Sequence, residues 1–118
     1  MPKLNIRNRT RQTVLATEAD TADSSYKRRV GLLKHKSLPA GQGLWIVPCE
    51  GIHTFGMKFP IDVLYLDRKK KVLKARPQMG PRRISLCLWA YSVLELPAGT
   101  IAAALTQSGD ELEFEEHD

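Results

Sequence analysis

The sequence has few cysteines that could form disulfides or metal sites, and it has no segment long and apolar enough to span a membrane. Its 118 residues include two cysteines, Cys49 and Cys87, whose spacing fits neither a Cys-x-x-Cys redox pair nor a zinc knuckle. We therefore expect two buried, reduced thiols. No hydrophobic run approaches the roughly 20 residues of a membrane-spanning helix. The first residues also lack the apolar stretch of a secretory signal, so we expect a cytoplasmic protein without a membrane span.

Positive charge is absent from the last part of the chain. Residues 84–118 hold seven acids and no Lys or Arg, whereas residues 1–83 hold all 18 basic residues and six acids, giving net charges of −7 and +12. Opposite charges in two parts of one small domain attract each other, so we expect internal complementarity. Aromatic residues make up only 7%, and no basic strand studded with aromatics is present, which makes a nucleic-acid partner unlikely.

Periodicity predicts one domain over residues 1–118 that is mainly β with one or two helices. Residues 22–35 have the apolar spacing of a helix that begins with a capping pair at Asp20 and Asp23, and residues 97–105 predict a short second helix. A parallel α/β sheet would need more helices. We expect a compact β-sandwich or jelly-roll-like barrel. The predicted strands are residues 4–8, 12–18, 44–47, 61–66, 72–76, 92–96 and 111–115.

Polar residues capable of binding a ligand occur around the strand at residues 61–66. His53 and Thr54 lie in a predicted loop before it, where an imidazole and a hydroxyl could meet at the rim of a pocket. A structural role for His53, bonded to a neighbouring carbonyl, is an equal alternative. Asp62 lies in an apolar strand and needs a partner, for which Arg28 is the candidate. Glu95, between two leucines, poses the same question.

Two kinds of chemistry are compatible with these residues. If Asp62 and Glu95 converge on His53, an acid/base site of hydrolase or lyase type results. Cys49, His53 and Met57 recur every four residues and are soft ligands that would suit monovalent copper. Glycines and a proline in this stretch argue against the helix that would align the three, and Met57 fits a core position. We therefore expect neither a metal nor a cofactor.

Five blocks of sequence carry a resemblance to a known family. They span residues 28–110 in order and together resemble the family called domain of unknown function 192. The resemblance implies a two-layer β-sandwich or jelly-roll-like barrel found in bacteria and archaea, with no agreed activity. Many relatives look exported, so the compartment of this chain is not taken from them. The blocks are Arg28-x-x-Gly31-Leu32, Gly43-Leu44-Trp45, His53-Thr54-x-x-Met57-x-x-Pro60-Ile61-Asp62-Val63, Leu94-Glu95-Leu96-Pro97-Ala98-Gly99 and Gly109-Asp110.

Three functions follow as hypotheses from these patterns. The first is a small binding module with a polar pocket around His53, Thr54 and Asp62 that takes a small molecule. The second is an acid/base enzyme that uses His53 with Asp62 or Glu95. The third is a structural or protein-interaction domain, monomeric or weakly oligomeric. No catalytic residue is assigned, and the candidate ligand-binding residues are Arg28, His53, Thr54, Met57, Asp62 and Glu95.

Overall fold

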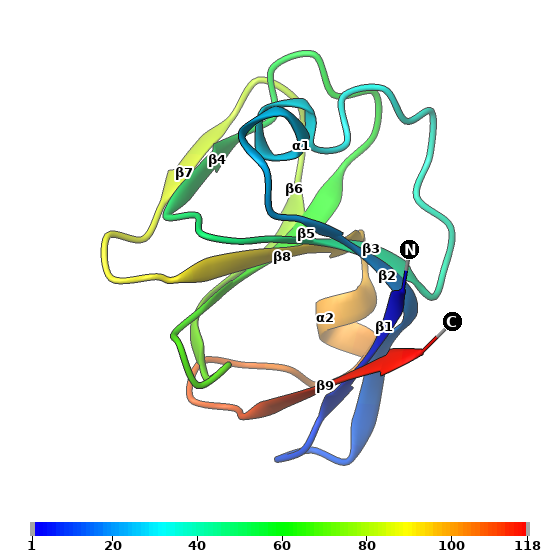
Figure 1. Ribbon diagram of the computed structural model, residues 1–118, viewed down its shortest axis with the longest axis vertical. Helices are drawn as coiled ribbons and strands as arrows, with labels where there is room; N and C mark the ends of the chain where they lie inside the picture. The colour runs from blue at the N-terminus through cyan, green and yellow to red at the C-terminus, as the bar shows by residue number, and fades with distance from the viewer. Residues whose placement is uncertain (1, 118) are drawn as a thin grey trace.

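The computed structural model describes residues 2–117 as a mainly β fold with two short helices (Figure 1). Seven strands form one sheet in the order β6-β5-β8-β3-β2-β1-β9, and β4 pairs with β7 in a separate two-stranded sheet. Neither helix is long and apolar enough to cross a membrane. The elements are β1 (Lys3–Asn8), β2 (Thr13–Ala22), α1 (Ser25–Val30), β3 (Gln42–Ile46), β4 (Gly51–His53), β5 (Ile61–Leu66), β6 (Val72–Met79), β7 (Ile84–Leu86), β8 (Ser92–Pro97), α2 (Thr100–Ala103) and β9 (Leu112–His117).

One strand pair of the large sheet is parallel. The beginning of β2 pairs antiparallel with β1, and its second half, Glu18–Ala22, runs parallel to β3. Parallel neighbours cannot be joined by a tight hairpin, because the chain must first return to the starting edge. Residues 23–41 make this return, and they carry α1 over one face of the sheet (Figure 1).

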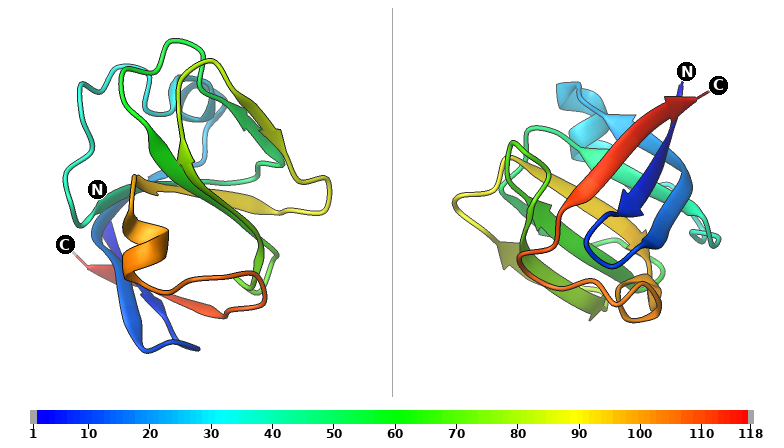
Figure 2. Two further views of the ribbon diagram at one scale, coloured as in Figure 1. Left: turned by 180° about the vertical axis from the view of Figure 1, so that it is seen from behind. Right: turned by 90° about the horizontal axis from the view of Figure 1, so that it is seen from below.

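The two faces of the central strands pack into two separate hydrophobic clusters. Leu64, Leu66, Leu94 and Leu96 point into the first, which fills the curl of the sheet between β5 and β8 on one side and β1 and β9 on the other (Figures 1 and 2). The alternate residues of β5 and β8, such as Val93, point into the second cluster. Both faces of β5 are therefore buried, which explains why all of its residues except Asp62 are hydrophobic.

The edges of the curled sheet meet only at one end. The Val72 N–H donates to the Asp110 carbonyl at 2.8 Å, the Leu112 N–H donates to the Lys70 carbonyl at 3.0 Å, and Lys71 and Glu111 form an isolated bridge. β6 and β9 share no further ladder within residues 2–117, so the sheet is not a closed barrel. The mainly β class with two helices is confirmed, and the predicted barrel is not found.

The first helix is shorter than residues 22–35. Ser24 caps α1, because its Oγ accepts the Lys27 N–H at 3.1 Å, and the chain leaves the helix at Gly31 with φ of +50°. The predicted capping pair of Asp20 and Asp23 is therefore wrong, since Asp20 lies in β2. The short strands β4 and β7 were not predicted, because three residues are too few to show an alternating pattern.

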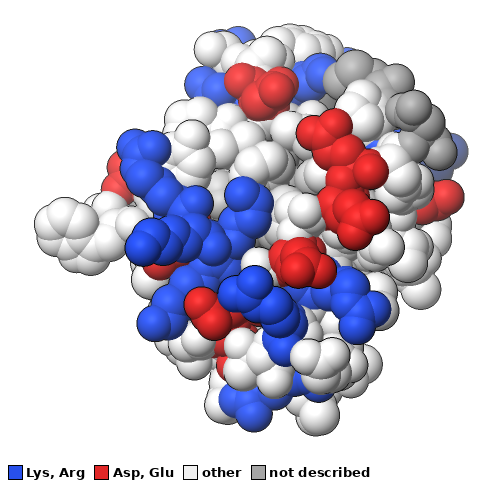
Figure 3. All heavy atoms as spheres, turned by 60° about the horizontal axis from the view of Figure 1, so that its bottom comes forward, with Lys and Arg blue, Asp and Glu red and all other residues white. Residues whose placement is uncertain are grey.

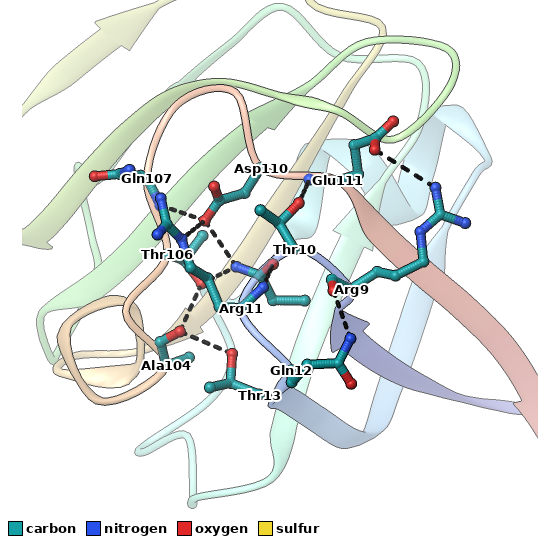
Figure 4. Close-up of polar contacts among 11 residues, drawn as sticks. Arg9, Thr10, Arg11, Gln12, Thr13, Ala104, Thr106, Gln107, Asp110 and Glu111 are labelled. Atoms are coloured by element: carbon teal, nitrogen blue, oxygen red, sulfur yellow. Dashed lines mark hydrogen bonds and ion pairs between the residues drawn. The ribbon is translucent and has the colours of Figure 1, made fainter.

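Ion pairs link the basic and acidic parts of the chain where the β1–β2 turn meets the start of β9 (Figure 4). Arg11 Nε lies 3.1 Å from Asp110 Oδ2, and Arg9 lies 3.7 Å from Glu111. Burial alone would raise the pKa of Asp110, but hydrogen bonds from Asn8, Arg11 and the Gln107 amide outweigh it and lower that pKa. Two C-terminal acids thus pair with N-terminal arginines, as the charge distribution predicts.

Candidate functional site

A cavity of about 240 Å³ lies between the α1 region and the second face of the large sheet. The crossover supplies one wall through α1 and the residues just after it, β4 supplies another, and β8 contributes a single acidic residue. Two glycines, Gly31 and Gly51, line it, and its polar and sulfur-bearing side chains are those of Arg28, Arg29, Cys49, His53, Met57 and Glu95.

Glu95 is the most unusual residue of this cavity. It lies in the middle of β8, between Leu44 of β3 and Val63 of β5, and only 5% of its surface is exposed. Within residues 2–117 its carboxyl group makes no hydrogen bond and no ion pair, and its oxygens open on the cavity instead of being fully enclosed. Burial raises the pKa of Glu95 to about 7, because the charged form loses its hydration. Near neutral pH this carboxyl group can therefore both donate and accept a proton.

The end of α1 faces Glu95 with backbone rather than with a side chain. A Cβ atom added to Gly31 would lie 4.0 Å from Glu95 Oε1, so the main chain passes close to the carboxyl group. Arg28, one turn earlier, also lines the cavity, but its guanidinium donates to the Asp23 carbonyl at 3.1 Å. The Arg28 guanidinium therefore forms no salt bridge with the Glu95 carboxylate.

Cys49, His53 and Met57 do line one cavity, as the copper hypothesis requires. Burial raises the pKa of the Cys49 thiol, which donates to the Gly51 carbonyl at 3.1 Å and is therefore protonated near neutral pH. A metal ion at Cys49 would have to displace this proton, so the raised pKa weakens the site. No three His, Cys, Asp or Glu side chains in the described part of the chain are grouped to share a metal ion. Cys49 and Cys87 are free and only half-buried, less buried than expected.

Thr54 does not line this cavity, because both of its hydrogen-bonding functions are used elsewhere. It is fully buried, its Oγ1 donates to the Gly80 carbonyl at 2.6 Å, and the same oxygen accepts the Arg83 N–H at 2.9 Å. The hydroxyl therefore ties the segment after β4 to the segment before β7. His53, its neighbour, is exposed at the end of β4 with its ring 5.8 Å from that of Phe55.

Asp62 lies on the other face of the sheet from Glu95. In β5 it alternates with Val63, the direct neighbour of Glu95, so its carboxylate points into the opposite cluster. There it accepts three main-chain N–H groups, from Gln78 at 2.7 Å, Ile101 at 2.8 Å and Gly99 at 3.1 Å. The predicted pair of Arg28 with Asp62 is therefore wrong, and Asp62 cannot act together with Glu95.

The six sequence candidates thus divide into two groups. Arg28, His53, Met57 and Glu95 line one cavity, whereas Thr54 and Asp62 are bonded to backbone elsewhere. Sequence reasoning missed Gly31 as the neighbour of Glu95. The block Arg28-x-x-Gly31-Leu32 carried that signal, since it joins a cavity residue to a glycine with positive φ.

The sequence of the chain also matches a known protein family. The profile of domain of unknown function 192 (DUF192), described as "Uncharacterized ACR", matches residues 6–114. The chain belongs to the DUF192 family. Three of the blocks that carry the resemblance in this DUF192 protein meet at the Glu95 cavity.

Two crystal structures show the same fold as this DUF192 protein. A protein of unknown function from Novosphingobium aromaticivorans superposes with a TM-score of 0.81 at 17% identity, over 96% of this chain and 84% of that chain. A "putative transcription regulator" from Sinorhizobium meliloti superposes with a TM-score of 0.83 at 18% identity, over 96% and 92%. At such identities the likeness concerns the fold alone. No curated protein matches the sequence.

Proposed function

We propose that this DUF192 protein binds a small polar molecule in the Glu95 cavity. The observation that carries the proposal is a carboxyl group that is almost fully buried, faces a cavity and has no partner in residues 2–117. Buried polar groups are nearly always hydrogen-bonded, and an unpaired buried acid destabilises the fold. A ligand that donates a hydrogen bond to Glu95 would remove this penalty.

The lining of the cavity restricts the chemistry of the ligand. Its volume of about 240 Å³ is below the ~300–1,000 Å³ of sites for drug-sized molecules, so the ligand is small. Glu95 selects a hydroxyl or ammonium donor, and Arg28 and Arg29 attract an anionic group. His53 can bond to either. A small organic acid with a hydroxyl or amino group satisfies both ends.

A thermal-shift screen of hydroxy acids and amino acids tests the proposal. A ligand that binds only the folded state raises the melting temperature. We expect this rise in the parent protein, a smaller rise in His53→Ala and none in Glu95→Ala. Glu50→Gln is the matched control, because it removes an exposed acid that does not line the cavity. An equal rise in the parent and in Glu95→Ala would show that the ligand binds elsewhere.

A second candidate function is acid/base catalysis by Glu95 with His53. It is favoured by the pKa of Glu95 near 7, where a carboxyl group exchanges protons most effectively, and by the presence of His53 in the same cavity. Ligands from the screen are incubated with the protein and analysed by NMR. Conversion that falls by about 100-fold or more in Glu95→Gln supports this function. Tight binding without conversion would mean that the protein binds the ligand but does not act on it as an enzyme.

A further inference from the structure

One edge of the molecule exposes four large apolar side chains that are close together in the sequence. Ile84 and Leu86 of β7 and Leu88 and Trp89 of the following loop form this apolar edge, and Trp89 is 89% exposed. They are four of the eight exposed large hydrophobic residues in the part of the chain that the structure describes, and they fall within six positions. A cluster of this density marks an interaction surface.

The apolar edge projects outward, and Leu88 and Trp89 at its end also border a surface hollow. Ser85 points inward and is buried, so Ile84 and Leu86, its neighbours on either side, point away from the core. The loop between β7 and β8 then extends beyond the body of the molecule (Figure 1), and it forms the uncharged projection in Figure 3. The apolar side chains on such a convex tip become buried when they insert into a binding partner.

Basic residues lie at both ends of the apolar edge. Arg82 and Arg83 directly precede Ile84, and Lys74 Nζ donates to the Leu86 carbonyl at 2.8 Å. At the other end, Arg68 and Lys69 line the same surface hollow as Trp89, and Figure 3 shows Lys and Arg side chains gathered beside the projection.

Two acids, Asp67 and Glu50, line the same hollow and match Arg68 and Lys69 in number. The Asp67 carboxylate is held in place by the backbone N–H groups of Lys69 and Lys71, at 2.8 and 2.9 Å. The excess of positive charge along the apolar edge therefore comes from Lys74, Arg82 and Arg83.

We infer that the apolar edge docks on an anionic lipid surface. Tryptophan and aliphatic side chains at an exposed tip enter the interface of a bilayer, and flanking Lys and Arg bind anionic headgroups. A symmetric dimer through this edge would bring like charges together. Single-stranded nucleic acid would need several stacking aromatics, whereas three of the four exposed side chains are aliphatic. This inference does not depend on the Glu95 cavity.

Co-sedimentation of the full chain with lipid vesicles tests the inference. We expect binding to vesicles of phosphatidylcholine mixed with phosphatidylglycerol, weaker binding to phosphatidylcholine alone, and a decrease as salt is added. The fluorescence of the protein should shift to the blue on binding, and Trp89→Phe should abolish this shift. Trp45, the other tryptophan, is half-buried against Phe114, so we expect its fluorescence not to shift on binding.

Matched variants distinguish binding through the apolar edge from non-specific hydrophobic adsorption and from non-specific charge attraction. Leu88→Ser should reduce binding about tenfold, whereas Leu105→Ser, at a residue of nearly equal exposure beside α2, should not (69% against 66%). Arg68→Gln with Lys69→Gln should reduce binding to anionic vesicles several-fold. Arg7→Gln with Arg9→Gln removes the same charge from the β1 end as the control.

Four results would overturn the inference. The first is no binding to anionic vesicles at low salt. The second is vesicle binding that Leu88→Ser leaves unchanged. The third is a dimer in sedimentation that Leu88→Ser dissociates, which would make a second copy the occupant. The fourth is binding of single-stranded DNA that requires Trp89 and competes with vesicles. None of these results bears on ligand binding at Glu95.

Discussion

Replacing Glu95 by glutamine should make the protein more stable above neutral pH. The pKa of Glu95 is about 7 in the folded protein against an ordinary value of 4.5. Between these pH values the folded protein holds a proton that the unfolded chain has released. The free energy of unfolding therefore falls by up to about 1.4 kcal/mol for each pH unit and by about 3 kcal/mol in total. Glutamine has nearly the same shape and no titration.

Chemical unfolding of both proteins over a range from about pH 5 to about pH 8 measures this difference. Every other titrating group, including Asp110, is common to the two proteins and cancels when their free energies of unfolding are subtracted. We expect Glu95→Gln to gain on the parent steadily as pH rises, and the gain to level off once Glu95 is ionised. NMR titration of the Glu95 carboxyl carbon should give the same pKa.

Two results would refute this reasoning. One is a difference between the two proteins that stays constant with pH, because the buried carboxyl would then titrate at its ordinary value. The other is an NMR titration of Glu95 complete near its usual range. Either result would mean that water or a protein group solvates the carboxylate, and the central argument for a ligand would be lost.

Three further substitutions test the structural roles described above. Asp62→Ala leaves three main-chain N–H groups without an acceptor and should lower the free energy of unfolding by about 3 kcal/mol, with faster hydrogen exchange at the Ile101 amide; a loss within about 0.5 kcal/mol would contradict this. Asp110→Ala should lose about 2–3 kcal/mol near neutral pH. The pKa of Asp110 is lowered in the folded protein, so this loss should shrink as pH falls below 3.8, and a constant loss would argue against the charge-assisted bonds. Gly31→Ala should cost about 1–3 kcal/mol, because its φ of +50° with ψ of −126° is a conformation that L residues avoid. Gly80→Ala, with open space and no positive φ, should change stability less in the same unfolding assay, and equal effects would contradict this.

The strongest sequence patterns predicted the framework well. Ile61–Leu66 and Ser92–Leu96 are apolar except for Asp62, Ser92 and Glu95 and are indeed central strands buried on both sides. The same property hid the site. Asp62 and Glu95 have identical surroundings in the sequence, an acid between two apolar residues, yet they point to opposite faces. An alternating pattern would have told the faces apart, but a strand buried on both faces has none.

The cavity itself could be predicted only in part. His53, Met57 and Glu95 were recognised as candidates from residue type and from the family resemblance. Their meeting with Gly31 depends on where residues 23–41 cross the sheet, which no local pattern encodes. The partner of Asp62 was missed because backbone N–H groups, unlike arginine side chains, leave no mark in a sequence.

The parallel pairing of β2 with β3 has a consequence for how relatives of this protein can diversify. Residues 23–41, and not a strand of the large sheet, form one side of the Glu95 cavity. Insertions or deletions in this segment would therefore change the size of the cavity without shifting the register of any strand. Glu95 on β8 would keep its position while the opposite side of the cavity changed. A single scaffold could in this way accommodate ligands of different length.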